Sequence, residues 1–178
     1  MKKTIFALAG SLLLLASCND GTTAGGAGGT VDSSAIKKEM KEERNKKTAM
    51  ASIEGFEKKD VDQILKDATP DAIDKGNGEM PEVKGVDSVK AGLKSWLDAM
   101  ESVKGSNLLY VADGDYVFVY GDWEGKFKSD FMGMKTAGKS YKVKDVDILK
   151  FNDEGKIIEH SNVQSNQTVM MQLNAPKR

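Results

Sequence analysis

The sequence is poor in the residues that build the commonest metal-binding and redox centres. It contains one cysteine, Cys18, and one histidine, His160. A single cysteine cannot form an intrachain disulfide, and a lone histidine without further cysteines cannot supply the spacing of a zinc site. We therefore expect no disulfide framework, no bound metal and no metal-dependent cofactor.

Arginine and an excess of positive charge are also missing. The chain has 26 basic and 27 acidic residues, and only Arg44 and Arg178 are arginines. Nucleic-acid binding needs a basic face, and bidentate recognition of phosphate or carboxylate usually uses arginine. The composition therefore excludes a nucleic-acid partner and disfavours a ligand of the phosphate or carboxylate class.

A long apolar run occurs at the start of the sequence. Two lysines precede apolar residues 5–16, which are too few to cross about 30 Å of hydrocarbon. This pattern is typical of a secretory signal peptide. The stretch LASC, residues 15–18, resembles the lipobox of bacterial lipoproteins, in which the signal is cut before the cysteine and the cysteine receives acyl chains such as palmitate.

This resemblance implies that residues 1–17 are removed and that Cys18 is the lipidation site of a membrane-anchored envelope protein. Two or three acyl chains hold a protein stably at a membrane. Asn19 follows the cysteine where some inner-membrane lipoproteins carry Asp, which favours the outer membrane over the inner membrane. The alternative is an ordinary secretory signal with a chance cysteine.

The first part of the remaining chain is expected to link the lipid to a folded domain. Residues 19–34 are rich in Gly, Ser and Thr, as in a flexible tether. We assign residues 18–45 to the lipidated cysteine, this tether and a charged helix start. The packed domain is expected to span residues 46–178.

The spacing of apolar residues predicts helices first and strands afterwards. Helices are expected at residues 33–59, 61–68 and 86–100, separated by the turn-rich segment 70–85 with a short strand at 72–74. Strands are expected at residues 107–112, 116–125 and 141–151 and from 157 onward, with hairpin turns at 113–115 and 152–156. This order predicts an α+β fold whose helices cover one face of a curved sheet.

Several stretches in this order resemble a known family. They are KGVDSVKAGLKSWL, ADGDYVFVYGDWEG and TAGKSYKVKDVDILKFNDEGKIIEH. Together they resemble the SnoaL-like polyketide cyclase branch of the nuclear transport factor 2-like superfamily over residues 46–174. The resemblance implies a cystatin-like cone, in which a strongly curved antiparallel or mixed sheet wraps around three N-terminal helices. It also implies a pocket at the open end and a possible homodimer through the outer sheet face.

Cyclases of this family use a carboxylate as general acid and base beside a carbonyl group. In the family the final strand usually supplies this carboxylate from an Asp, and this sequence has Ser165 at that position. The segment KVKD stands where the preceding strand of the family has a histidine. This departure favours binding of a small, mostly apolar molecule without robust catalysis. Two alternatives stay open: an acid/base isomerase or cyclase using Asp122 or His160, and a scaffold for protein interactions.

Candidate ligand-binding side chains lie on the predicted strands. They are Tyr116, Tyr120, Trp123, His160, Asn162 and Gln164. Strand alternation places Tyr116, Tyr120 and Asp122 on one face and Trp123 on the other. Asp145 and Asp147 are expected at the surface, in cross-strand pairs with the lysines at 142, 144 and 150.

Overall fold

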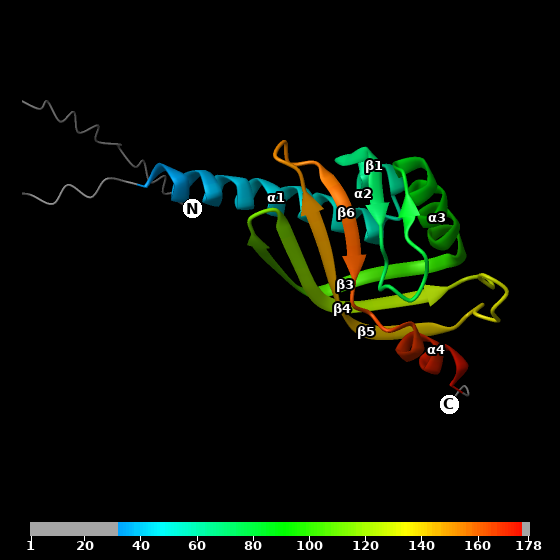
Figure 1. Cartoon of the computed structure of the whole chain (residues 1–178). Helices are drawn as coiled ribbons and strands as arrows, with labels where there is room; N and C mark the ends of the chain where they lie inside the picture. Colours follow the sequence, from blue (N-terminus) through cyan, green and yellow to red (C-terminus); the bar gives the residue numbers. More distant parts are fainter. Residues whose placement is uncertain (1–31, 176–178) are drawn as a thin grey trace, which may run out of the picture. The chain divides into compact units, whose positions relative to one another are not determined.

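The computed structural model describes residues 32–175, which form an α+β fold around one six-stranded sheet (Figure 1). The helices are α1 (Ser33–Lys58), α2 (Val61–Leu65), α3 (Val86–Ala99) and α4 (Asn166–Asn174). The strands are β1 (Ala68–Asp74), β2 (Val83–Lys84), β3 (Met100–Asp113), β4 (Tyr116–Phe127), β5 (Ser140–Phe151) and β6 (Ile157–Asn162). The predicted α+β class is confirmed.

The sheet is mixed. Its strand order is β2-β1-β6-β5-β4-β3, in which β1 and β6 are parallel and the other neighbours are antiparallel. The parallel pair brings the end of β1 beside β6, although more than eighty residues separate them in the sequence. This pairing places side chains of β1, β6 and β5 in adjacent positions on one face.

Three details differ from the expected cone. The sheet is twisted rather than strongly curled, and α2 is a single short turn of five residues, so three long N-terminal helices do not form. Residues 166–174 form α4, where we expected the tail of the last strand. The apolar positions Val169, Met170 and Leu173 recur with a helical period, and Leu173 is 2% exposed, so this helix packs through one face.

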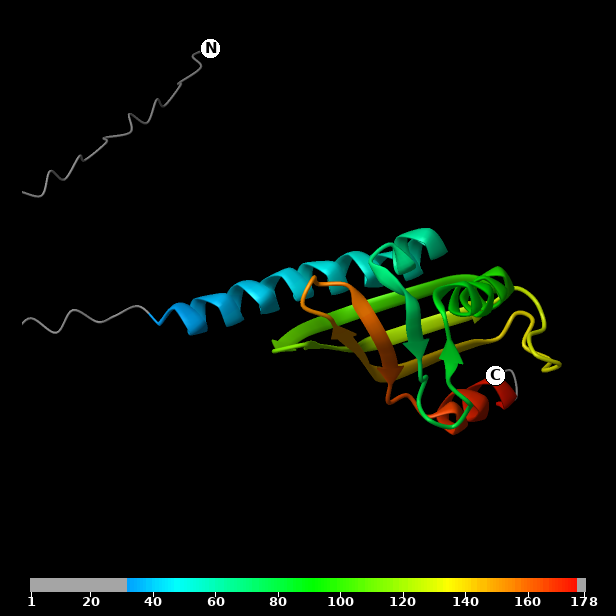
Figure 2. The ribbon, with the colours of Figure 1, turned by 45° about the horizontal axis from the view of Figure 1, so that its top comes forward.

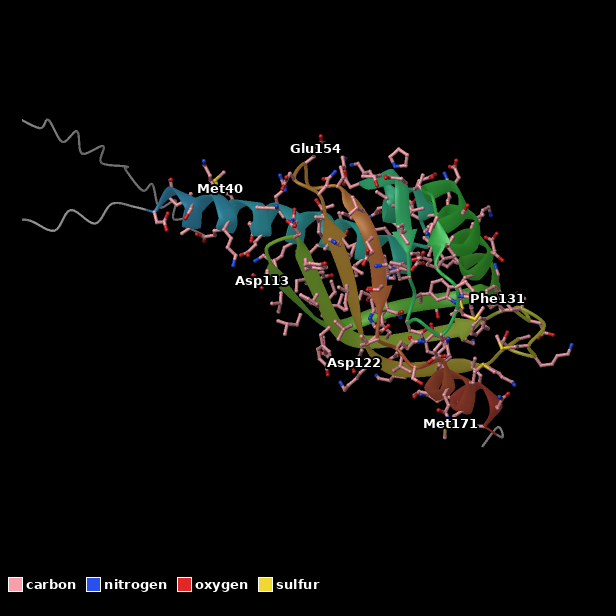
Figure 3. All side chains as sticks on the ribbon, viewed as in Figure 1. Met40, Asp113, Asp122, Phe131, Glu154 and Met171 are labelled. Carbon is pink, nitrogen blue, oxygen red and sulfur yellow. The ribbon has the colours of Figure 1, made fainter. Side chains whose placement is uncertain are left out.

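Helix α1 begins with an N-cap, because the Asp32 side chain accepts a hydrogen bond from the Ser34 amide. The side chains of residues 33–40 are exposed. The charged first half is anchored at Lys41, which pairs with Asp115 and Asp153, at 2.5 and 2.8 Å, in the β3–β4 and β5–β6 turns. Asp113 and Glu154 mark these two turns in Figure 3. The helix start therefore adjoins the tips of both hairpins.

The core lies between the helices and the inner face of the sheet. In β4 and β5 buried and exposed residues alternate, so that apolar side chains at odd positions face inward. Helices α1 and α3 lie on the same side of β3 and β4 (Figure 2). Among residues 32–175, no helix has both the length and the hydropathy of a membrane span.

Candidate functional site

An apolar cavity of about 750 Å³ lies between the helices and the inner sheet face. This volume lies in the range of pockets that hold small organic molecules. Its aromatic wall consists of Phe56, Trp96, Trp123, Phe127, Phe131 and Tyr141. The segment between β4 and β5 contributes Met132 and Met134, and α4 contributes Met170. Methionine side chains are flexible and polarisable, so this side of the cavity can adapt to differently shaped ligands.

The aromatic wall is held by specific contacts. The Phe56 ring packs edge-to-face against Trp96 and Trp123, with centroids 6.2 and 6.0 Å apart. On β4, Gly125 leaves space for the Tyr141 ring, because a Cβ atom at Gly125 would lie 2.4 Å from a ring carbon. Glycine at this position therefore lets Tyr141 turn inward and form part of the wall.

A row of three polar side chains crosses the cavity wall. The His160 Nδ1 atom lies 3.0 Å from Asp74 Oδ1, and its Nε2 atom lies 3.3 Å from Asp147 Oδ1. The sheet sets this geometry, because Asp74 is the register partner of His160 on β1, while β5 supplies Asp147 from the other side. The imidazole is thus flanked by two carboxylates, and both ring nitrogens can donate.

The two carboxylates change the acidity of the imidazole. Burial by itself lowers the pKa of His160, but hydrogen bonds and charge interactions with Asp147 and Asp74 outweigh it and raise the pKa to about 10. For Asp74, burial raises the pKa, but the hydrogen bond and charge of His160 and the Gly76 amide lower it overall. At neutral pH His160 is therefore an imidazolium that lies between the carboxyl groups of Asp74 and Asp147.

Asp145 lies beside this row. Burial and the neighbouring Asp147 charge raise its pKa, although the Asn162 side chain donates to it at 2.8 Å and the Val146 and Val163 amides donate at 2.7 and 3.2 Å. Asp147 is 8% exposed, and its Oδ2 atom has no hydrogen-bond partner among the described residues. The wall thus holds one carboxyl group with a raised pKa and one incompletely hydrogen-bonded carboxylate.

The expected surface position of Asp145 and Asp147 was wrong. Both are buried and line the cavity, whereas Lys142 and Lys144 point to the opposite face of β5. Odd positions of β5 also carry Val143 and Leu149, which are buried. The parity of these apolar neighbours was the signal that could have placed the two acids inside.

The structure brings four of the predicted ligand-binding residues to the cavity and leaves the others on the opposite face. Trp123, His160, Asn162 and Gln164 line the cavity. Tyr116 and Tyr120 are 37% and 41% exposed on the outer face, so they do not meet a ligand in it.

The two catalytic candidates, Asp122 and His160, have different surroundings. Asp122, labelled in Figure 3, lies on the outer face. Hydrogen bonds from Lys144 at 2.7 Å and Asn107 at 2.8 Å lower its pKa, so it is not a proton carrier for the cavity. His160 lines the cavity, but its raised pKa makes it a fixed cation.

Other predicted positions have no direct part in this wall, and one participant was missed. Ser165 is the N-cap residue of α4, and Cys18 lies outside the described residues. Asp74 was not predicted, because its proximity to His160 depends on the long-range pairing of β1 with β6. Within residues 32–175, no three His, Cys, Asp or Glu side chains are arranged to hold a metal ion.

Helices packed on a mixed six-stranded sheet, with an apolar cavity between them, define a nuclear transport factor 2-like α+β protein. The family model described as SnoaL-like polyketide cyclase matches residues 46–173. The chain belongs to this family, which confirms the resemblance found in the sequence. No curated protein sequence matches the chain.

Solved structures agree with this assignment. A candidate polyketide cyclase from Xanthomonas campestris has a TM-score of 0.69 and 19% identity over 75% of this chain and 99% of that chain. A SnoaL-like candidate polyketide cyclase from Jannaschia has a TM-score of 0.64 and 22% identity, and the match covers 76% of this chain and 95% of that chain. A nuclear transport factor 2-like protein of unknown function from Burkholderia pseudomallei has a TM-score of 0.61 and 17% identity, and the match covers 74% of this chain and 98% of that chain. At these identities the likeness shows the fold alone.

Proposed function

We propose that this protein binds a small, mostly apolar molecule in the cavity and transfers a proton to or from it. The observation that carries this proposal is the Asp74–His160–Asp147 row, which lies in an otherwise apolar wall. Desolvated carboxyl groups in such surroundings are one established means of acid/base chemistry near neutral pH.

The residues of the wall suggest distinct roles. Asp145 is suited to accept and return a proton, because burial raises its pKa above that of an ordinary Asp and the side chain lines the cavity. His160 keeps its own proton at neutral pH, so it acts as a fixed positive charge that orients Asp147 and stabilises negative charge developing on the ligand. Ser165 therefore does not by itself exclude catalysis, since β5 supplies carboxylates from another direction.

Exchange of a carbon-bound proton tests this function directly. The probe is 2-tetralone, an apolar aromatic ketone with acidic protons beside its carbonyl, followed by NMR in D₂O. We expect the full-length protein to accelerate deuterium uptake, and Asp145→Asn to reduce the acceleration by about 100-fold or more. Asp122→Asn is the matched control, because it removes a carboxylate on the outer face and should exchange like the parent protein.

Ligand binding without catalysis is the second candidate function. It is favoured by Ser165 at the position where family cyclases carry Asp, and by a histidine that stays protonated at neutral pH because its pKa is raised to about 10. Native mass spectrometry of protein purified from its own cells would show a bound small mass. Such a mass, together with exchange no faster than in buffer, would establish this function over catalysis.

We also propose that the protein is lipid-anchored in the cell envelope, at the outer membrane rather than the inner. The support is the LASC stretch and the apolar run before it. Metabolic labelling with an alkyne analogue of palmitate should mark the native protein. Cys18→Ser should abolish the label and move the protein out of the membrane fraction, and retention of both would refute lipidation at this residue.

Pairing of two copies through the outer sheet face is proposed for the same protein. Leu109, Val111 and Phe118 are 58%, 49% and 38% exposed on adjacent strands, and neighbouring exposed apolar side chains commonly mark an interface. Light scattering should give a dimer mass that Phe118→Glu reduces to a monomer mass. A monomer at all concentrations would refute the pairing.

A further inference from the structure

The cavity wall carries more negative than positive charge. Asp74, Asp145 and Asp147 supply carboxyl groups, and His160 supplies the sole cationic side chain among the described lining residues, which include no lysine or arginine. With both flanking carboxylates ionised and the imidazole protonated, the row itself has a net charge of −1. Any ionised fraction of Asp145 adds to this negative charge.

The negative charge is incompletely compensated by hydrogen bonds. Asp74 accepts from the Gly76 amide and contacts His160. Within residues 32–175, the one hydrogen-bond partner of Asp147 is His160, and its Oδ2 atom is buried without a partner. Burying a carboxylate with so few donors is costly, and a nearby positive charge lowers that cost. One positive charge, that of His160, therefore faces at least two carboxylates, and a ligand can provide a second positive charge.

The remaining wall suits the apolar part of a cationic ligand. Six aromatic rings and several aliphatic side chains surround the space beside the polar row. Burial of an apolar ligand body is favourable, and the faces of Trp, Tyr and Phe rings attract a positive charge. The aromatic wall and the carboxylates thus favour the same kind of molecule.

From this combination we infer that the cavity selects lipophilic amines, whose protonated nitrogen lies at the carboxylate row and whose apolar body fills the aromatic part. This inference rests on the proposed binding function and names its ligand class. It also implies that carboxylic acids of the same size are rejected, because the wall offers them no arginine or lysine.

Three probes that differ only in their polar group test the selection. They are 1-naphthylmethylamine, 1-naphthalenemethanol and 1-naphthoate, titrated into the full-length protein at pH 7.5 by isothermal calorimetry. We expect the amine to bind about tenfold more tightly than the alcohol, and the carboxylate about tenfold more weakly, from charge interactions at a partly desolvated site. Higher salt should reduce the amine preference.

Two variants with opposite expected effects separate charge from general damage. Asp147→Asn removes a negative charge and should reduce the ratio of amine to alcohol affinity by about threefold or more. His160→Gln removes the positive charge and should increase the same ratio. Asp122→Asn changes a carboxylate outside the cavity and should leave the ratio unchanged. Asp74→Asn replaces Asp147→Asn if the latter does not fold.

The outcomes distinguish this inference from the function on which it rests. Tighter binding of the amine, with the two opposite changes in ratio, supports the inference. Equal or tighter binding of the alcohol overturns the amine preference but preserves binding of apolar molecules in the cavity. Preference for the carboxylate, or unchanged ratios in both cavity variants, also overturns it. Failure of all three probes to bind overturns the inference, and exchange of the 2-tetralone protons then decides the proposed function separately.

Discussion

The stability of the protein should depend on pH through His160, the only histidine in the chain. Its pKa is raised from an ordinary value of 6.5 to about 10 by Asp147 and Asp74, which outweigh the opposing effect of burial. A folded-state pKa above the unfolded value contributes stability that is fully present below pH 6.5. That stability is lost as the pH rises through about 10.

The size of the effect follows from this difference in acidity. Each tenfold change in the acid dissociation constant corresponds to about 1.4 kcal/mol. The difference between a pKa of 6.5 and one of about 10 therefore gives a ceiling of about 5 kcal/mol. The His160 side chain is 32% exposed, so solvent screens part of the interaction, and we expect about 3 kcal/mol. Most of this should be lost between pH 6.5 and 10.

Urea unfolding measured through Trp96 and Trp123 fluorescence at several values between pH 5.5 and 9.5 would detect this loss. His160→Gln should flatten the decline, and Asp147→Asn should reduce it by lowering the histidine pKa. Other groups titrate in this range, so the informative quantity is the difference between variant and parent at each pH. Parallel profiles for the parent protein and His160→Gln would refute the charged row.

Two further predictions concern the core and the wall. Gly125→Ala should lower the free energy of unfolding by about 1–3 kcal/mol, because the new Cβ would overlap the Tyr141 ring. In the control Gly92→Ala, in α3, the new Cβ atom meets no atom within 4 Å, and the substitution should stabilise the protein by about 0.5–1 kcal/mol. Equal effects of the two glycine substitutions on the free energy of unfolding would refute the steric argument. Leu97→Ala should cost about 2–5 kcal/mol at a 2% exposed position, whereas Met40→Ala, 67% exposed on α1, should change stability by about 0.5 kcal/mol or less in chemical denaturation.

Local sequence patterns were sufficient for much of the fold. The apolar spacing in residues 86–100 predicted α3, and alternation predicted β4 and β5 with their hairpin turns. The same alternation assigned Tyr116 and Tyr120 to the face opposite Trp123, as observed. These predictions succeeded because helix and strand periods depend on neighbouring residues within one segment.

The cavity contents were harder to predict. Lysines beside Asp145 and Asp147 suggested an exposed strand, although their odd positions are shared with buried apolar residues. Position within a strand gives the relative face of two side chains, but which face is buried depends on the layer packed against it. Here that layer is formed by helices remote in the sequence.

The sequence by itself determined the α+β class, the family and the alternation that separates Trp123 from Asp122. It also contains a single histidine, so a metal site built from several histidines was not expected. Only the tertiary structure decided that His160 lies between Asp74 and Asp147. The physical reason is that parallel pairing of β1 with β6 and antiparallel pairing of β6 with β5 bring three distant segments to one row. No local period specifies such pairing, because it depends on how the whole sheet is assembled.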